Sequence, residues 1–186
     1  MKKELKDVAR ISIGASLTRY SKNYEGKKQK MNVLYCTVKE FYIKEGDIGE
    51  DIDSKYLTQK GDVIFKLSEP QIAISVDENG EIPENVVVSS KFAILKPIDM
   101  DPTFLAELLN SGTAKIQIQR FTEGVIKQIK KSDVEKLKFE IPSIEEQTEY
   151  VETIKLINKE ISLQKKLIAE NMKLKEAIIQ KTQGGE

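Results

Sequence analysis

The segment GDVIFKLSEP, residues 61–70, carries two carboxylates and an amine at close spacing. Asp62, Lys66 and Glu69 are residue types that nuclease-like sites combine, because carboxylate oxygens bind Mg²⁺ and an ammonium stabilises developing negative charge. Their spacing is not distinctive, and Pro70 interrupts the segment. In a chain with 32% charged residues such trios arise easily, so we interpret these side chains as surface charges rather than as an active site.

Other residues that support catalysis are missing from the composition. The chain has no histidine, which excludes histidine general bases, His-dependent triads and most zinc sites. Gly14 and Gly61 are isolated turn glycines rather than parts of a phosphate-binding loop. The single cysteine, Cys36, excludes an internal disulfide and is interpreted as a small core residue. We therefore predict a chain that is not an enzyme by itself and that holds neither a metal ion nor a cofactor.

The net charge does not indicate a nucleic-acid ligand, because 30 Lys and Arg residues balance 30 Asp and Glu residues. The basic residues are nevertheless clustered in segments 19–30 and 115–131, so a neutral total can hide a positive surface. The sequence contains no run of eighteen apolar residues and its N-terminus lacks the apolar centre of a signal peptide. We expect a cytoplasmic protein that does not enter a membrane.

Residues 1–142 alternate short apolar runs with turn residues, which predicts a single mixed α/β domain within an α+β fold. Runs rich in β-branched and aromatic residues predict strands at residues 31–43, 63–67, 71–76, 86–95 and 137–141. Asp101-Pro102 opens a predicted helix that ends at Asn110-Ser111-Gly112. Polar residues predict a loop over 16–30 and a second loop or short helix that reaches Arg120.

The remaining residues, 143–186, predict one long helix. Ser143 and Glu146 have the spacing of a capping box, in which each side chain bonds to the other residue's main-chain amide. Pro142 cannot continue a preceding helix, so the boundary is sharp. No glycine or proline follows before residue 182, and about forty residues at ~1.5 Å each give a rod roughly 60 Å long.

The predicted long helix carries two adjacent apolar stripes, with steps of three and four residues that are typical of coiled coils. Such a helix needs a packing partner, and the chain has no second helix of this length. The helix either folds back on its own domain or pairs with the same helix of a second chain, and we favour the pairing. The residues predicted to form this dimer are Ile154, Ile157, Ile161, Leu163, Leu167, Ile168, Leu174 and Ile178.

Several segments, taken in order, resemble the specificity subunits of type I restriction-modification systems. The most specific is the junction LKFEIPSIEEQTEYVETI, residues 137–154, where a short strand ends in Ile-Pro and Glu-Glu-Gln lies in the first turn of a long helix. Each segment is weak alone, and their order makes the resemblance specific. The other segments are KGDVIFKLSE (60–69), VVVSSKFAILKP (86–97), DPTFLAELLNSG (101–112) and GVIKQIKKSDVEKLKFEIP (124–142).

The resemblance implies a DNA-recognition role within a larger complex. A full-length specificity subunit has two target-recognition domains, each reading half of a bipartite site in double-stranded DNA, and two long helices that form an antiparallel spacer. This chain has one domain and one helix, so the resemblance implies a homodimer that rebuilds that arrangement. The implied partners are an adenine methyltransferase, which would bind S-adenosylmethionine, and a restriction or translocating subunit.

Polar and basic loops of the domain are the expected source of DNA contacts. Arginine and amide side chains suit base edges and lysines suit phosphates, although a solvated charge is the alternative for each lysine. The residues predicted to contact DNA are Arg19, Tyr20, Lys22, Asn23, Lys27, Lys28, Lys66, Ser68, Ser90, Lys91, Gln117, Gln119, Arg120 and Lys127.

A second function stays open on sequence grounds. Because the net charge is zero, the chain could keep the fold without reading DNA. It would then be a regulatory or interaction protein that competes for the methyltransferase or for a full-length specificity subunit. Salt-sensitive DNA binding in the presence of the methyltransferase distinguishes the two functions.

Overall fold

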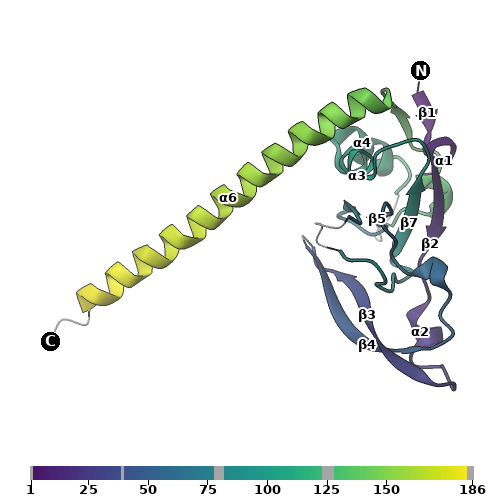
Figure 1. The fold of residues 1–186 in the computed structure, drawn as a ribbon, viewed down its shortest axis with the longest axis horizontal. Coiled ribbons are helices and arrows are strands. Elements are labelled where there is room, and N and C mark those ends of the chain that lie inside the picture. Colours follow the sequence, from purple (N-terminus) through teal and green to yellow (C-terminus); the bar gives the residue numbers. More distant parts are fainter. Residues whose placement is uncertain (1, 39, 78–81, 123–127, 184–186) are drawn as a thin grey trace. The chain divides into compact units, whose positions relative to one another are not determined.

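The structure is a computed structural model and describes residues 2–38, 40–77, 82–122 and 128–183 (Figure 1). It divides into two compact units, Met1–Gln147 and Thr148–Glu186. The first unit is mixed α/β, and the second consists of the long helix α6 (Ile144–Gln183), whose first turn belongs to the first unit. The predicted fold class is therefore confirmed.

A four-stranded antiparallel sheet forms the centre of the first unit. Its strands, in spatial order, are β2 (Ala9–Ile13), β7 (Phe92–Pro97), β5 (Val63–Lys66) and β6 (Ala73–Ser75). Strand β5 is buried on both faces, with Val63 and Phe65 in one core cluster and Ile64 in another. A strand covered on both faces needs apolar residues at successive positions, which is why this segment shows a continuous run rather than an alternation.

Two ribbons and several short helices complete the first unit. The ribbons are β1 (Lys2–Glu4) with β8 (Lys138–Glu140) and β3 (Lys28–Cys36) with β4 (Phe41–Gly49). The helices are α1 (Leu5–Val8), α2 (Leu17–Tyr20), η1 (Ser54–Tyr56), α3 (Pro102–Asn110), α4 (Gly112–Gln119) and α5 (Lys131–Val134). Figure 1 shows the hairpin β3–β4 at one end of this unit and helices α3 and α4 at the other.

The core is built on both faces of the sheet. One cluster joins β5 and β7 to the helices through side chains such as Leu105 and Ile118. The other cluster joins the sheet to the hairpin, where the Phe41 and Phe92 rings lie 5.9 Å apart between centroids. The hairpin is therefore held by apolar packing as well as by main-chain bonds, and it forms a stable wall beside the sheet.

The predicted single strand over residues 31–43 is wrong, since two strands occupy this region. Strand β3 ends at Cys36 and β4 begins at Phe41, and the two pair from Cys36–Phe41 to Lys28–Gly49. The main-chain amide of Thr37 donates to the carbonyl of Glu40 over 2.9 Å, which closes the connection. The turn was missed because β-branched residues occupy it, whereas glycine, proline and asparagine are the usual turn signals.

The predicted strand over residues 86–95 is also divided. Residues 86–89 are extended, and Val87 bridges β3 at Val33, but they form no named strand. A turn at Ser90-Lys91 follows, closed by the Phe92 amide donating to the Ser89 carbonyl over 3.0 Å, and β7 then begins. The sequence signal for this turn is the run of three polar residues, Ser89-Ser90-Lys91, inside an otherwise apolar segment.

Two amide side chains of the family-like segments complete main-chain hydrogen bonding. Asn110 accepts from the amide of Ala73 over 2.8 Å and donates to its carbonyl over 2.9 Å, which satisfies both groups of a sheet-edge residue. Gln147 is 1% exposed, accepts from the amide of Asp101 over 3.0 Å and donates to the carbonyl of Pro142 over 3.0 Å. These motif residues hold elements together.

Helix α6 begins as predicted. The Ser143 amide donates to the Glu146 carboxylate over 2.9 Å, and the Glu146 amide donates to the Ser143 hydroxyl over 3.3 Å, which is the predicted capping box. The helix continues to Gln183 without a break. No helix in the described part of the chain is both long and apolar enough to span a membrane.

Candidate nucleic-acid interface

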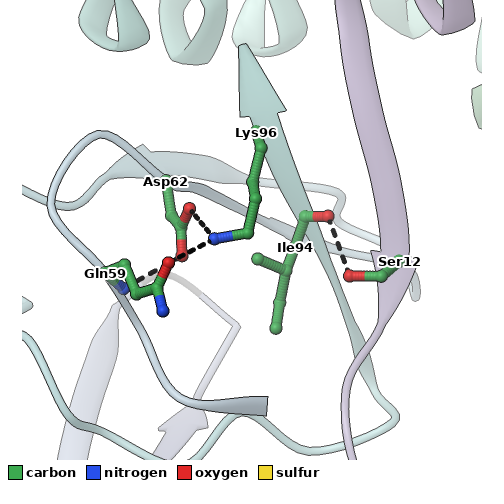
Figure 2. Close-up of polar contacts among 5 residues, drawn as sticks. All are labelled: Ser12, Gln59, Asp62, Ile94 and Lys96. Carbon is green, nitrogen blue, oxygen red and sulfur yellow. Dashed lines mark hydrogen bonds and ion pairs between the residues drawn. The ribbon is translucent and has the colours of Figure 1, made fainter. Parts of the chain in front are cut away.

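Asp62 and Lys66 were interpreted as surface charges, and the structure shows that this interpretation is wrong for both. Their exposed fractions are only 2% and 8%. Asp62 accepts from the main-chain amide of Gln59 over 2.9 Å and from Lys96 Nζ over 3.0 Å. Figure 2 shows Lys96 reaching from β7 to this carboxylate, with the Gln59 side-chain oxygen 2.7 Å from the same amine. The Asp62 site is thus a satisfied structural network.

Gly61, which precedes Asp62, allows this network to form. Its φ of +86° lies in the left-handed region, where a side chain would be strained. The chain reverses here and enters β5, so that the Asp62 carboxylate turns back onto the Gln59 amide. The Gly-Asp pair that resembled the family motif is therefore a turn that is closed by a hydrogen bond from the Gln59 amide to the Asp62 side chain.

Gly14 brings a second pair of segments into close contact. A Cβ at this position would lie 2.4 Å from the carbonyl oxygens of both Val88 and Ser89, so that only glycine fits. The Ala15 amide then donates to the Val88 carbonyl, and the Ser90 amide donates to the Ala15 carbonyl, each over 2.8 Å. This contact places the start of α2 beside the turn at Ser90-Lys91.

These close contacts form one wall of a cleft of about 530 Å³, which we call the Lys66 cleft. The end of β3 and the start of β4 form a second wall, in which the Tyr35 and Tyr42 rings are stacked with centroids 5.5 Å apart. No aspartate or glutamate is among its described lining residues. Those residues are Ser16, Leu17, Thr18, Leu34, Tyr35, Cys36, Thr37, Val38, Tyr42, Lys66, Ser68, Ser89, Ser90, Lys91 and Phe92.

Lys66 is the most deeply buried charged group of the cleft. It is the last residue of β5 and pairs with Phe92 of β7, so its main chain is fixed by the central sheet. Its Nζ donates to the Thr37 carbonyl over 3.4 Å, a long contact, and no carboxylate pairs with it among the described residues. Within the described residues, this amine, which has three donor hydrogens, therefore has one weak acceptor.

Cys36 lies in the same cleft, and two features of the cleft affect the pKa of its thiol. Burial raises the pKa of the Cys36 thiol, because the thiolate is poorly solvated there, and the nearby Lys66 ammonium opposes that rise. The thiol donates to the Thr37 carbonyl over 3.0 Å. Cys36 is half-buried, so the sequence interpretation of a core residue holds only in part.

The structure brings four of the predicted DNA-contacting residues together and separates the others. Lys66, Ser68, Ser90 and Lys91 all line the cleft, although they come from two segments more than twenty positions apart. The other lining residues were not predicted to contact DNA, among them the polar residues Ser16, Thr18 and Tyr42. Sequence reasoning missed them because no local signal shows which loops converge.

The predicted residues of the first loop have mixed environments. Arg19, Lys22, Asn23, Lys27 and Lys28 are exposed, as a DNA contact requires. Among the described residues, no carboxylate pairs with Lys22 or Lys28, whereas Lys27 pairs with Glu50 over 2.9 Å.

Tyr20, by contrast, is 9% exposed and belongs to a core cluster. Its ring meets that of Tyr56 edge to face with centroids 6.1 Å apart, and the Arg19 guanidinium lies 5.6 Å from the Tyr20 ring centroid. Tyr20 thus supports the position of Arg19 more than it offers a surface of its own.

The late polar residues lie outside the Lys66 cleft. Gln117 bonds to both main-chain groups of Lys138, each over 2.9 Å, so it joins α4 to β8. Gln119 lines a smaller pocket, and Arg120 is exposed. Lys127 lies outside the described residues.

The apolar residues of α6 are exposed in the single chain. Among the predicted dimer residues, Leu167 is 62% exposed, Leu174 is 60% exposed and Ile161 is 43% exposed. Ile154 is partly buried, and the remaining four are exposed. Large apolar side chains are costly to leave in water, and their spacing is typical of helices that form coiled coils.

Comparison with known proteins decides the family. The family model described as the type I restriction modification DNA specificity domain matches residues 1–171. The chain belongs to this family. The resemblance found in the sequence is thus confirmed. No curated protein sequence matches the chain.

Two solved structures share the fold of this specificity domain. One comes from work on complex assembly and conformational transition of the type I R-M system, with a TM-score of 0.70 and 19% identity over 99% of this chain. The other is the HsdS subunit from Thermoanaerobacter tengcongensis, with a TM-score of 0.66 and 21% identity over 97% of this chain. The matches cover 48% and 47% of those chains, so this specificity domain spans about half of their length.

Proposed function

We propose that the chain is a DNA sequence-recognition subunit of a type I restriction-modification system that acts as a homodimer. The observation that carries this proposal is the exposed double apolar stripe of α6, joined to a family domain that spans half the length of its solved relatives. Two copies paired through α6 would supply two recognition units and two helices, the number expected in a full-length subunit.

The symmetry of such a dimer determines what it reads. Identical recognition units related by a two-fold axis contact identical half-sites in inverted orientation. The expected target is therefore an interrupted palindrome, and the length of α6 sets the spacing between its halves. A subunit with two different recognition domains would read two unrelated half-sites.

Chemistry belongs to the partners in this proposal. A modification methyltransferase binds S-adenosylmethionine and methylates adenine, and a restriction or translocating subunit joins the same complex. The recognition chain positions them on the DNA. Its own contributions are the polar cleft and loops of the first unit and the apolar surface of α6.

The decisive experiment combines methylation mapping with a helix variant. The chain is co-expressed with a type I modification methyltransferase in a methylation-free host, and modified adenines are mapped across the genome. Leu167→Glu places a charge in the apolar stripe, and Lys166→Glu is the matched control on the adjacent exposed position. Light scattering on the purified chains measures the oligomeric state.

We expect a two-part palindromic motif for the wild-type chain and for Lys166→Glu, both of them dimers. Leu167→Glu is expected to weaken dimerisation at least tenfold, because a carboxylate buried in a coiled-coil seam is strongly unfavourable. Methylation should then fall with the dimer. An asymmetric motif would contradict the homodimer, and a monomeric wild-type chain that methylates normally would contradict the role of α6.

One observation favours the second function, a regulatory protein that does not read DNA. Two lysines of the first basic segment are already neutralised, since Lys27 pairs with Glu50 over 2.9 Å and Lys30 pairs with Asp47 over 3.0 Å. If each chain makes about three phosphate contacts, DNA binding by the dimer should show a log-log salt slope of about −5. A slope near zero, with the methyltransferase complex assembled, would favour the regulatory function.

A further inference from the structure

We propose that the Lys66 cleft is a phosphate site and that a backbone phosphate of duplex DNA occupies it in the DNA-bound protein. The inference rests on the proposed DNA-reading function and makes it more specific. It assigns a ligand to the buried amine of Lys66. The exposed lysines of the first loop are not part of this site.

The first argument is the electrostatic environment of Lys66. Its side chain is 92% buried, given an exposed fraction of 8%, and its amine has one carbonyl at 3.4 Å. A buried ammonium without a counter-ion is unfavourable unless a ligand supplies the negative charge. Within the described residues the cleft lining contains no carboxylate that could do so. The site is thus built for an anion that comes from outside.

The second argument is the set of donors around that amine. Ser68 follows Lys66 on the same segment, and Ser90 and Lys91 lie opposite, where the Leu67 amide donates to the Lys91 carbonyl over 3.0 Å. Ser16 and Thr18 face the same space from the segment fixed by the close contact at Gly14. Two ammonium groups and several hydroxyls suit a compact oxyanion, and lysine as a point charge suits phosphate.

The third argument is the shape of the site. The cleft is open to solvent on one side, with the exposed Lys91 among its lining residues and the buried Lys66 deeper inside. A phosphate on the outside of a duplex can enter such a cleft without unstacking a base. The hairpin wall with the stacked Tyr35 and Tyr42 would then lie beside the DNA backbone and fix the register of the recognition unit.

The single thiol of the chain provides a direct test. Cys36 lines the cleft, so an occupant that fills the cleft should slow the alkylation of Cys36 by a maleimide. The alkylation rate is measured by mass spectrometry on the intact chain. Two phosphate sources are compared: a duplex of random sequence at low salt, and inorganic phosphate. Fluorescence anisotropy in the same samples records whether the duplex is bound, because phosphate contacts do not need a specific sequence.

Two variants and a control link the protection to Lys66. Lys66→Met keeps the length and apolar character of the stem but removes the charge. Ser90→Asp changes an exposed residue and places a carboxylate in the cleft as an internal competitor. Lys136→Met removes an exposed positive charge outside the cleft and is the control. Each chain is compared with itself, with and without the phosphate source.

In the wild-type chain and in Lys136→Met, we expect the bound duplex to slow alkylation of Cys36 about tenfold. Lys66→Met and Ser90→Asp should lose this protection and bind the duplex roughly tenfold more weakly, the effect of one charge-assisted contact. A duplex that binds without protecting Cys36 would overturn the phosphate site and leave the proposed function intact.

The remaining outcomes separate the phosphate sources. Protection by inorganic phosphate but not by a bound duplex would overturn the assignment to DNA and identify a site for a free phosphate compound. Absence of duplex binding, measured with the methyltransferase also present, would contradict the proposed function itself. In that case the inorganic phosphate samples alone decide whether the cleft binds phosphate.

Discussion

Two lysines on neighbouring strands of the central sheet show opposite relations between burial and pairing. Lys96 on β7 has a side chain that is 40% exposed, yet it lies 3.0 Å from the Asp62 carboxylate and 2.7 Å from the Gln59 side-chain oxygen. Lys66 on β5 is 8% exposed and has one carbonyl at 3.4 Å. For stability alone the more buried amine should be the better paired.

The difference indicates that the two sites serve different ends. Asp62 finds one partner three residues away, at the Gln59 amide, and the other on the neighbouring strand β7, at Lys96, so the network is complete in the folded chain. At Lys66 the amine has one long contact, with the Thr37 carbonyl over 3.4 Å, and none of the described lining residues is acidic. Such a surface gains stability when an anion binds, which is the property expected of a binding site.

The largest expected effect comes from Gly14→Ala, which breaks the wall of the Lys66 cleft. The added Cβ would lie 2.4 Å from two main-chain carbonyl oxygens, so the segments must separate. We expect a loss of about 3 kcal/mol in the free energy of unfolding, measured by urea titration. Gly112→Ala is the control, because a Cβ there meets nothing within 4 Å. Equal effects of the two substitutions would contradict the close contact.

The second effect concerns the paired side of the comparison. Asp62→Ala removes a buried carboxylate, leaves the Gln59 amide without its acceptor and deprives Lys96 of its counter-ion. We expect a loss of about 1–3 kcal/mol in the free energy of unfolding, since Lys96 can still reach water. Asp47→Ala, which removes an exposed ion pair with Lys30, is the control and should cost less than about 1 kcal/mol. A neutral Asp62→Ala would show that this network adds no stability.

The features predicted correctly from sequence are those set by local chemistry. The capping box at Ser143 and Glu146 needs only residues three positions apart, and the Asp101 cap of α3 needs only the two amides that follow it. The long helix follows from the absence of glycine and proline. Periodicity and capping act within one or two turns, so they can be read without knowledge of the rest of the chain.

The features that were missed depend on contacts between distant segments. Lys66 reads as a surface residue because lysine usually is one, and only the convergence of the hairpin, α2 and the turn at Ser90 buries it. The turn between β3 and β4 was missed because apolar packing on Phe92 fixes the hairpin there without the usual turn residues. The alternation over residues 31–43 was real, but it belonged to two strands.

The third effect tests the unpaired side of the comparison and has the opposite sign. Lys66→Met removes a buried charge and keeps the stem, so the free energy of unfolding should stay the same or rise by up to about 1 kcal/mol. Lys96→Met, the control on the neighbouring strand, should lose about 1–3 kcal/mol because the buried Asp62 carboxylate then lacks its counter-ion. A large loss for Lys66→Met would mean that its amine is needed for folding, and the comparison would fail.

The smallest effect is on the pH profile of the single thiol. Burial raises the pKa of Cys36 and the Lys66 ammonium opposes the rise, since a positive charge favours the thiolate. Alkylation requires the thiolate. Without any ligand, the pH at which the rate is half-maximal should therefore be higher than for an exposed cysteine. Lys66→Met removes the opposing charge and should raise the pKa further, which slows alkylation at any pH below it. The exposed control Lys136→Met should leave the profile unchanged. An acid shift in Lys66→Met would contradict the position of the ammonium beside Cys36, and with it the electrostatic basis of the cleft.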